Sequence, residues 1–493
     1  MRPPGASGLL VAGTSSDAGK SLVVTGLCRA LVRRGLDVAP YKAQNMSNNS
    51  GVCADGAEIG RAQLLQAAAA RVEPTSAMNP VLLKPGTDRR AHVVVRGRPA
   101  GVLEAGQYAT GRQHLAQAAW AAYAELEAAY DLIVCEGAGS PAEINLRAGD
   151  YVNLGLARRF GLPVVVVGDI DRGGVLAALY GTVALLEPED RALVRTFVIN
   201  KFRGDPSVLA PGLTEITRRT GVPFAGVLPW LDGVWLDAED TLEVGAWRRS
   251  ASGPSANGLL RVAVVRLPRV SNATDVEALA AEPGVEVRVT TDPDVVAGAD
   301  LAVLPGTRAT FSDLGWLRRT GLADAVLDRA RRRAPVLGIC GGYQMLGLGV
   351  EDLEGVETQA PARVEGLGLL PVGTRFEREK TLGRPSGTWQ GHPVRAYEIH
   401  HGRARREAGD AEPFLDGWRS GVTWGTVWHG ALENDGFRRA WLAEVAAAAG
   451  CTWTAAPDAP AFGARRETMI DALADAVEEH LDLDLLLAGT RAA

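Results

Sequence analysis

The chain has 493 residues, of which 46% are hydrophobic and 22% charged, a composition that excludes wholesale disorder, collagen and coiled coil. Its 52 basic and 58 acidic residues leave a net charge of −6, so there is no overall positive field to attract a nucleic acid. Uncharged apolar runs such as LPVVVVG at 162–168 are far shorter than the ~20 residues that span a bilayer. Five cysteines without paired spacing suggest neither disulfides nor zinc. We expect a cytoplasmic protein of more than one domain, with no nucleic-acid partner and no membrane contact.

The first half of the chain alternates short apolar runs with longer amphipathic ones, which predicts an α/β fold with a parallel sheet and crossover helices. A helix is expected at 112–127, where Leu115, Ala119, Ala122 and Leu126 form one apolar stripe. Strands buried on both faces are expected at 8–12, 132–135, 163–167 and 196–199.

A change of composition divides the chain. Residues 233–258 end in GAWRRSASGPSANG, which combines Gly, Ser, Pro and Asn without apolar periodicity, so a linker is expected there. An α/β pattern restarts at 259, with apolar runs near 301–306 and 334–340, and closes with a helix at 468–481 that the capping-box spacing of Thr468 and Asp471 would begin. The predicted organisation is a first domain at 1–232, the linker, and a second domain at 259–493 that includes this helix.

A candidate phosphate loop lies near the N-terminus. In LLVAGTSSDAGKS, residues 9–21, an apolar strand precedes a Gly-rich turn that opens a helical pattern. The N–H groups of such a turn point at an anion, Lys20 can reach the terminal phosphates, and the Ser21 hydroxyl can bind Mg²⁺. The spacing is unusual, because five residues rather than four separate Gly13 from Gly19.

A nucleotide site of this kind also needs a carboxylate for the metal ion, usually at the end of a neighbouring strand. Glu136 ends the apolar run DLIVCE and leads into the small residues of GAGSP. Without the phosphate loop it would be interpreted as an ordinary residue at a strand end. Together with the loop it is a candidate metal ligand.

A candidate nucleophile lies in the second domain. In VLGICGGYQMLGLG, residues 336–349, Cys340 follows an apolar strand and has glycines on both sides, as in the serine elbow of hydrolases. A helix N-terminus lowers the pKa of a thiol and supplies N–H groups for an oxyanion. Cys28 and Cys135, in apolar segments, are interpreted as structural.

A thiol nucleophile needs a general base, and the seven histidines restrict the choice. His429 follows an apolar, strand-like run in TWGTVWHG, and His400 and His401 in AYEIHHG are the competitors. Spacing alone favours His429 only slightly, so the choice stays open at this point.

Many long motifs in one order resemble the cobyric acid synthase family, the glutamine-dependent amidotransferases of cobalamin biosynthesis, over essentially residues 8–485. In the first half the motifs are GTSSDAGKS, YKAQNMSNNS, ADGAEIGRAQ, EPTSAMNPVLLKP, EGAGSPAEINL, GDIDRGGV and VINKFRGD. In the second half they are LPGTRATFSDLGWLR, GICGGYQMLG, YEIHHG and GTVWHG.

The resemblance implies an N-terminal dethiobiotin-synthetase-like P-loop ATPase domain, in which the extra residue of the loop is normal. It implies Mg²⁺ on Ser21 and Glu136, with Asp55 or Glu58 as a further metal carboxylate. Asp169, Asp171 and Arg172 would belong to the cleft for ATP and the corrin. The ATP contacts would come from Gly13, Thr14, Asp17, Gly19, Lys20, Ser21 and an adenine-reading Asn200.

For the second domain the resemblance implies a class I glutamine amidotransferase fold in which Cys340 is the nucleophile and His429 its base. Backbone N–H groups near Gly306 and at Gly341 would hold the oxyanion. Most such domains have a Glu two residues after the histidine, but Ala431 stands here, so a dyad is implied. His401 and Trp428 depart from the side chains expected in their motifs.

The implied activity uses ATP and glutamine to amidate four peripheral carboxylates, b, d, e and g, of adenosylcobyrinic acid a,c-diamide through an acyl phosphate, giving cobyric acid. ATP and Mg²⁺ would be the cofactors, and glutamine and a corrinoid the substrates. The nearest rival is cobyrinic acid a,c-diamide synthase, against which the motifs AQNMS and EINL argue. A P-loop ATPase switch would leave Cys340 and His429 unexplained.

Overall fold

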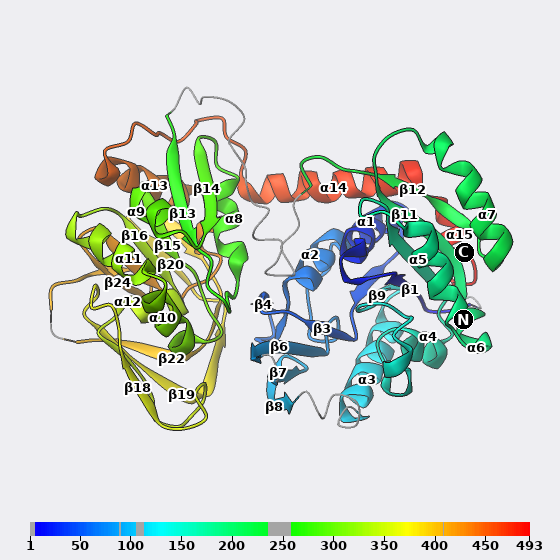
Figure 1. Ribbon diagram of the computed structural model, residues 1–493, viewed down its shortest axis with the longest axis horizontal. Helices are drawn as coiled ribbons and strands as arrows, with labels where there is room; N and C mark the ends of the chain where they lie inside the picture. Colours follow the sequence, from blue (N-terminus) through cyan, green and yellow to red (C-terminus); the bar gives the residue numbers. More distant parts are fainter. Residues whose placement is uncertain (1–4, 88–89, 105–112, 235–257, 408) are drawn as a thin grey trace. The chain divides into compact units, whose positions relative to one another are not determined.

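The computed structural model describes residues 5–87, 90–104, 113–234, 258–407 and 409–493, which form two compact α/β units (Figure 1). The predicted linker, 233–258, lies outside the described residues except at its two ends. Among the described helices, none has the length and apolar character needed to cross a bilayer. The first unit comprises Met1–Ser47, Cys53–Asp237 and Arg466–Ala493, and the second comprises Asn48–Val52 and Ala238–Arg465.

The first unit is built on a parallel sheet with the order β12-β11-β10-β1-β9-β2. The chain builds β2 and β9 on one side of β1 and then β10, β11 and β12 on the other, so β1 lies where the strand order reverses. The four strands predicted in this half are confirmed as β1, β9, β10 and β11, and β2 and β12 complete the sheet. The bounds are β1 (Gly8–Gly13), β2 (Val38–Tyr41), β9 (Leu132–Glu136), β10 (Val164–Asp169), β11 (Val194–Phe202) and β12 (Phe224–Pro229).

Both faces of this sheet are buried, which explains the nearly continuous apolar character of its strands. Leu10 and Ala12 of β1 lie in one hydrophobic cluster, and Leu9 and Val11 lie in another.

The helices of the unit are α1 (Lys20–Arg33), α2 (Arg61–Ala70), α3 (Gln113–Ala129), α4 (Leu154–Phe160), α5 (Val175–Ala184), α6 (Pro188–Arg191), α7 (Ala210–Thr220), most of α14 (Phe462–His480) and α15 (Leu483–Leu487). Short 3-10 turns are η1 (Ser16–Ala18), η3 (Ile144–Gly149) and η4 (Pro206–Val208). A smaller sheet has the order β3 (Gln44–Met46), β6 (Val81–Thr87), β7 (Arg90–Val95) and β8 (Arg98–Glu104), and β5 is Glu58–Gly60.

The second unit has a sheet of the order β14-β13-β15-β16-β25-β24-β23, parallel from β14 to β25 and antiparallel at β24 and β23. Its strands are β13 (Leu260–Val265), β14 (Val285–Thr290), β15 (Leu301–Leu304), β16 (Val336–Ile339), β23 (Glu412–Phe414), β24 (Gly417–Ser420) and β25 (Thr423–Thr426). The other strands of the unit are β4 (Ser50–Val52), β17 (Gly349–Asp352), β18 (Ala362–Glu365), β19 (Val372–Gly383), β20 (Ser386–Trp389), β21 (His392–Arg395) and β22 (Glu398–Arg406). Its helices and turns are η6 (Ala273–Val276), α8 (Glu277–Ala280), α9 (Pro293–Gly298), α10 (Thr310–Arg319), α11 (Leu322–Arg331), α12 (Gly341–Leu346), η7 (Ala431–Glu433) and α13 (Asp435–Ala449).

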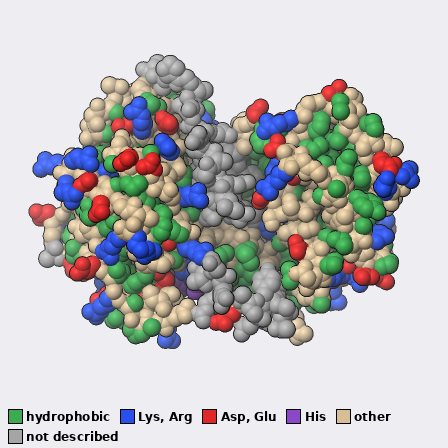
Figure 2. Space-filling view, in the orientation of Figure 1, with side chains coloured by type: hydrophobic (Ala, Val, Ile, Leu, Met, Phe, Trp, Pro, Cys, Tyr) green, Lys and Arg blue, Asp and Glu red, His purple; other side chains and the backbone are tan. Residues whose placement is uncertain are grey.

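On the face shown in Figure 2, Lys and Arg side chains are interspersed with Asp and Glu side chains over both units. Ion pairs between neighbouring side chains account for part of this mixture. For example, Glu215 lies 2.8 Å from Arg218 and 2.6 Å from Arg219 on α7. The mixed surface agrees with the small net charge of the chain.

The C-terminal helix departs from the expected division. The prediction placed it in the second domain and began it at Thr468, but α14 begins at Phe462 and the chain from Arg466 onward belongs to the first unit. Its residues Ile470 and Val477 share a buried cluster with residues of α1, and Figure 1 shows the two helices side by side. The sequence pattern predicts the apolar face of this helix, but it does not indicate which domain packs against that face. Thr468 lies inside the helix because residues 462–467 contain no proline, and their one glycine, Gly463, stands in the first turn, where it does not interrupt the helix.

Arg29 of α1 holds α14 against α1 through ion pairs, and its substitution tests this packing. Its guanidinium is 1% exposed, lies 2.8 Å from both Glu467 and Asp471 of α14, and donates to the carbonyl groups of Ala68 and Ala69. Arg29→Ala removes all these bonds at once and is expected to destabilise the first unit by about 3 kcal/mol. Thermal or urea unfolding would measure the loss.

Arg34→Ala is the matched control. Arg34 pairs with Asp484, whose side chain is 91% exposed, and such pairs contribute about 0–1 kcal/mol. Equal destabilisation by the two substitutions would contradict the importance of the buried guanidinium.

Candidate active sites

The phosphate loop joins β1 to α1 in the first unit. The strand ends at Gly13, the Thr14 N–H donates to the Val167 carbonyl of β10, and α1 begins directly after Gly19. Gly19 has φ of 93°, a left-handed conformation that favours glycine. The Lys20 ammonium lies 2.8 Å from the carbonyl oxygens of both Ser15 and Ser16. The loop therefore folds around its lysine, as a cradle for an anion does.

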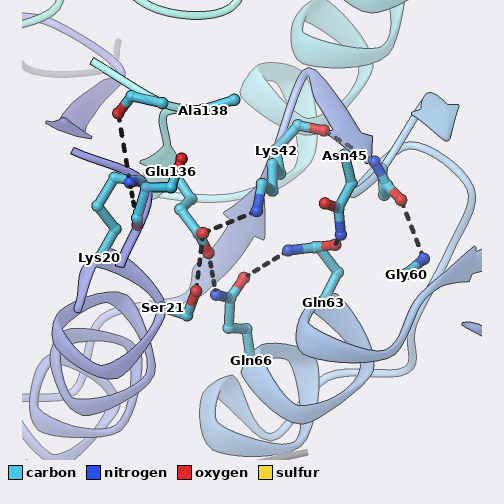
Figure 3. A network of polar contacts seen from close by, with 12 residues as sticks. Lys20, Ser21, Lys42, Asn45, Gly60, Gln63, Gln66, Glu136 and Ala138 are labelled. Atoms are coloured by element: carbon cyan, nitrogen blue, oxygen red, sulfur yellow. Dashed lines mark hydrogen bonds and ion pairs between the residues drawn. The ribbon is translucent and has the colours of Figure 1, made fainter. Parts of the chain in front are cut away.

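The Glu136 carboxylate is the centre of a buried polar network beside this loop (Figure 3). The Ser21 hydroxyl donates to its Oε1 at 2.9 Å, the Lys42 ammonium contacts the same oxygen at 2.8 Å, and the Gln66 amide donates to Oε2 at 2.5 Å. Lys42 and Glu136 are 5% and 1% exposed, so each neutralises a charge that would be costly to bury alone. The predicted association of Ser21 with Glu136 is thus seen as a direct hydrogen bond.

The strand register explains the position of Lys42. Tyr41 of β2 is paired with Cys135 of β9, so Lys42 and Glu136 are the next residues at the carboxyl ends of two adjacent parallel strands. Burial beside Glu136 also raises the pKa of the Cys28 thiol, and burial raises that of Cys135. These two cysteines are therefore protonated and inert, in agreement with their structural interpretation.

The network continues away from the phosphate loop. Gln66 accepts from Gln63 at 3.4 Å, and Gln63 accepts from Asn45 at 3.1 Å, so a row of buried amides extends from the carboxylate. A second buried ion pair joins Glu58 to Lys84 at 2.6 Å, with both side chains at most 4% exposed.

The two candidates for a further metal carboxylate differ in their surroundings. Glu58 is buried and held by Lys84, whereas Asp55 is exposed and accepts from the N–H of Ala57 at 3.0 Å. Within the described ranges no three His, Cys, Asp or Glu side chains converge as metal ligands. Ser21 Oγ and Glu136 Oε1, 2.9 Å apart, do form a pair of oxygen donors of the kind that Mg²⁺ accepts alongside phosphates and water. The donors present therefore fit Mg²⁺ bound together with a nucleotide.

Charged side chains from three loops meet near η1. Asp169, at the end of β10, lies 2.8 Å from the Lys201 ammonium, which also donates to the Asp17 carbonyl. The side chain of Asp17 pairs with Arg172 at 2.8 Å. The structure thus brings together Asp17, Asp169 and Arg172, for which the sequence analysis gave no mutual contacts. Asp171 lies at the outer end of the same loop, paired with Arg203 at 3.3 Å.

Asn200, at the end of β11, lies against the phosphate loop. Its amide donates to the Ala18 carbonyl at 3.0 Å, and a Cβ on Gly19 would come within 2.0 Å of its Nδ2. The amide nitrogen therefore positions the loop, and the amide oxygen is the atom that could accept from an adenine amino group.

In the second unit Cys340 lies between β16 and α12 with φ of 51° and ψ of −111°. This strained conformation is that of a nucleophile elbow. A Cβ on Gly342 would lie 2.0 Å from the Leu304 carbonyl oxygen, so glycine is required where the elbow approaches β15. The predicted reason for the flanking small residues is confirmed at this position.

His429 follows β25, the parallel neighbour of β16, and its imidazole forms a side-chain hydrogen bond with Cys340. On the other side its Nδ1 lies 2.7 Å from Oδ2 of Asp275, whose second oxygen accepts from the Gly430 N–H at 2.9 Å. His429 and Asp275 are 1% and 3% exposed. Cys340, His429 and Asp275 thus form a continuous row from thiol to carboxylate.

The electrostatics of this row favour a charged imidazole. Burial lowers the pKa of His429, but the Asp275 carboxylate and Cys340 raise it by more, to about 10. At neutral pH the ring is therefore an imidazolium beside the sulfur, the state that stabilises a thiolate.

The implied dyad is corrected by this geometry. Ala431 lies in η7 and offers no carboxylate, but Asp275 supplies one from η6, after β13. The loops after parallel strands meet at one edge of a sheet, so an aspartate far away in sequence can take the place of a glutamate two residues on.

Gly306 and Gly341 lie beside the thiol. A Cβ on Gly306 would be 3.6 Å from the Cβ of Cys340 and 3.1 Å from His429 Cε1. A Cβ on Gly341 would be 3.1 Å from the backbone N of Thr307. The backbone of both predicted oxyanion positions therefore borders Cys340.

The competing histidines have other contacts. His400 lies with Nδ1 2.8 Å from the Gly402 carbonyl and Nε2 3.4 Å from Glu398, and His401 contacts the Glu377 carbonyl at 3.1 Å. The geometry favours His429 as the partner of the thiol.

Comparisons with known proteins agree with both halves. Residues 9–244 match the model of the CobQ/CobB/MinD/ParA nucleotide binding domain, and residues 261–437 match that of the CobB/CobQ-like glutamine amidotransferase domain. The chain is 64% identical to the cobyric acid synthase of Cutibacterium acnes, over 98% of this chain and 99% of that protein. It is 58% identical to that of Mycolicibacterium gilvum, with 98% and 96% covered, and 59% to that of Streptomyces coelicolor, with 97% and 95% covered.

The chain belongs to the cobyric acid synthase family. It is an enzyme with a P-loop nucleotide-binding domain and a glutamine amidotransferase domain, and the predicted fold class is confirmed. The nucleotide-binding domain implies the use of ATP.

Four side chains of the two candidate sites were not predicted from the sequence. Lys42 and Lys201 lie in motifs that carried the resemblance and at or near strand ends, which is the signal that could have identified them. Gln66 lies in α2, three residues after the motif ADGAEIGRAQ ends, and had no such signal. Asp275 gave no such signal. Its turn, NATDV, has no apolar periodicity and no motif that had been assigned a function.

The Asp275 contact predicts a change in titration. Asp275→Asn keeps the shape of the side chain but removes the negative charge, so the pKa of His429 should fall by about 1 to 3 pH units from its raised value. An NMR titration of isotope-labelled histidine would measure it, with His429→Gln to assign the resonance. An unchanged pKa would show that Asp275 does not hold the imidazolium.

The same shift affects stability. Because the folded pKa lies above the ordinary value of ~6.5, the stabilisation is complete below that value and is lost as the pH rises toward 10. The stability advantage of the wild type over Asp275→Asn should therefore shrink across this pH range.

Proposed function

We propose that the chain catalyses the ATP- and glutamine-dependent amidation of the b, d, e and g carboxylates of adenosylcobyrinic acid a,c-diamide, giving cobyric acid. One observation carries the proposal: the chain matches cobyric acid synthases along almost its whole length. A phosphate loop and a thiol–imidazole pair within that one chain support it. Each unit would perform one half of the reaction, the first activating a carboxylate and the second supplying ammonia.

In the ammonia-forming half, the sulfur of Cys340 attacks the side-chain amide carbon of glutamine. The negative oxygen that results would be held by backbone N–H groups at Gly341 and beside Gly306. The His429 imidazolium gives its proton to the nitrogen as the carbon–nitrogen bond breaks, which releases ammonia and leaves a glutamyl thioester beside a neutral imidazole.

Water then opens the thioester. The neutral imidazole of His429 accepts a proton from the attacking water and the carbon–sulfur bond breaks, so glutamate is released and the sulfur and the imidazolium return to their starting state. Asp275 would act throughout by fixing the ring orientation through Nδ1 and stabilising the imidazolium. The net reaction is glutamine and water to glutamate and ammonia.

In the synthetase half, a corrin carboxylate oxygen attacks the γ-phosphorus of ATP, forming an acyl phosphate and ADP. Ammonia then attacks the acyl carbon and phosphate leaves, so an amide forms without a protein nucleophile. Lys20 would exchange its contacts with the Ser15 and Ser16 carbonyls for phosphate oxygens. The backbone N–H groups of the loop, with Gly13, Thr14 and Asp17, would surround the same phosphates.

Mg²⁺ would be held by Ser21 and Glu136 together with phosphate oxygens, and when bound it would neutralise charge on the phosphates. Lys42, 2.8 Å from Oε1, would hold the Glu136 carboxylate in the orientation that this role needs. Asn200 would meet adenine through its amide oxygen, and Asp169, Asp171 and Arg172 would border the cleft for nucleotide and corrin.

Mass spectrometry of the product tests the function. With ATP, Mg²⁺, glutamine and adenosylcobyrinic acid a,c-diamide, four successive additions are expected, each replacing a carboxyl OH by NH2. Cys340→Ala should form no product from glutamine but should form it from high ammonium at alkaline pH, because the synthetase half never uses the thiol.

His429→Ala should resemble Cys340→Ala with some residual turnover, and His400→Ala should be much milder. No addition to the a,c-diamide, but two additions to cobyrinic acid, would identify the a,c-diamide synthase activity instead. Hydrolysis of ATP without any amide product would favour a nucleotide switch. Failure of ammonium to rescue Cys340→Ala would contradict the two-site mechanism.

The metal ligand beyond Ser21 and Glu136 can be decided by a paired substitution. Glu58→Gln removes the buried partner of Lys84, whereas Asp55→Asn alters an exposed side chain. If one of them binds Mg²⁺, its amide variant should need a severalfold higher Mg²⁺ concentration for half-maximal activity. If Glu58 only neutralises Lys84, Glu58→Gln lowers stability and leaves the Mg²⁺ dependence unchanged.

A further inference from the structure

The segment Asn48–Val52 comes from the N-terminal half of the chain but is part of the second unit. It follows the strand that carries Gln44–Met46, six residues after Lys42, and the chain returns to the first unit at Cys53. The nucleotide-binding half of the sequence therefore contributes a piece of the amidotransferase unit.

This segment is bonded to the loop that leads into η6. The Ser50 N–H donates to Asn272 Oδ1 at 2.9 Å, and the Ala273 N–H donates to Asn49 Oδ1 at 3.2 Å. The Ser271 hydroxyl donates to the Asn48 carbonyl at 2.8 Å. Asn49, Ser50 and Asn272 are almost completely buried, so these bonds are shielded from water.

The loop held in this way supports the thiol–imidazole–carboxylate row from two directions. Asn272, with φ of 54°, and Ala273 immediately precede Asp275, the partner of His429. One residue earlier in the chain, the Ser271 N–H donates to the Gly306 carbonyl at 2.9 Å. A shift of this loop would therefore move both the Asp275 carboxylate and the backbone beside Cys340.

The far end of the segment reaches the other side of His429. Val52 packs with Tyr397 and Ile399 in a small buried cluster. The Tyr397 ring stacks on the His429 ring with centroids 5.3 Å apart, and the two residues exchange backbone hydrogen bonds. The same short segment thus contacts the loop that carries Asp275 and the aromatic ring that covers His429.

We propose that Asn49 is a positioning residue of the glutamine site, acting through the Ala273 N–H to hold Asp275 against His429. The inference rests on the proposed amidotransferase function of Cys340, His429 and Asp275. Asn49 touches no reacting atom, so it should affect the rate of ammonia release and the state of His429 rather than the binding of glutamine.

Asn49→Ala removes the acceptor for Ala273. We expect the kcat for glutamate release to fall about 10- to 100-fold, since a displacement of about 1 Å at a catalytic group can cost about 100-fold, with little change in the KM for glutamine. The pKa of His429, followed by NMR, should fall toward that of Asp275→Asn. Amidation supported by ammonium should stay within about twofold of the wild type.

Two further variants make the test specific. Adding Asn49→Ala to Asp275→Asn should cause no further loss of kcat, because a residue that acts through Asp275 has nothing left to position. Met46→Ala, which alters a side chain 45% exposed in the same stretch of chain, should leave kcat and the His429 pKa unchanged.

The proposal is overturned if Asn49→Ala leaves kcat and the His429 pKa at wild-type values, or if its effect adds fully to that of Asp275→Asn. It is also overturned if the variant loses glutamine- and ammonium-supported activity equally while its melting temperature falls. Glutamate release and the NMR titration need no corrinoid. A failure of the proposed corrin reaction would therefore appear in the wild type and would not be confused with a failure here.

Discussion

Both candidate sites depend on the fact that parallel strands end at the same edge of a sheet. In the first unit β1, β9 and β10 deliver the phosphate loop, Glu136 and Asp169 to that edge. In the second, β13, β15, β16 and β25 deliver Asp275, Gly306, Cys340 and His429. The reactive groups belong to loops, but the strands fix where each loop begins, so their spacing is as rigid as the sheet.

A second constraint concerns three buried carboxylates of these sites, each of which lies against a cation. Glu136 lies against Lys42, Glu58 against Lys84, and Asp275 against His429. Such pairs contribute little net stability, since desolvation offsets most of their attraction, but the removal of one partner is costly. Their value is orientation, because a carboxylate held by an ammonium or an imidazolium keeps a defined direction. In the His429 pair the same interaction also sets the protonation state of the base.

The two units do not follow the order of the sequence. The α14 and α15 helices return to the first unit after the whole of the second has been built, and α1 receives them through Arg29 and an apolar cluster. In the opposite direction, Asn48–Val52 leaves the first half to join the second unit. The chain thus connects the two units at several points, and neither unit consists of one continuous segment.

The fold class, four strands of the first sheet and the two local motifs whose chemistry is contained in a few successive residues could be predicted from the amino-acid sequence alone. In the phosphate loop and in the elbow around Cys340, the backbone conformation and the direction of the side chain follow from glycine placement between a strand and a helix. The proximity of Ser21 and Glu136 was also foreseeable, because both follow strands of one parallel sheet.

Which groups from distant parts of the chain meet is seen only in the folded protein. Asp275 precedes His429 by more than 150 residues, and Lys42 precedes Glu136 by more than 90, so neither pair leaves a periodic pattern in the sequence. The sequence also gave no indication that the apolar face of α14 packs against α1 of the first unit. A local sequence pattern shows that an element has an apolar face to bury or a charged residue to pair. It does not show which distant element packs against that face or pairs with that charge, because this depends on the order of the strands and the path of the chain in the folded molecule.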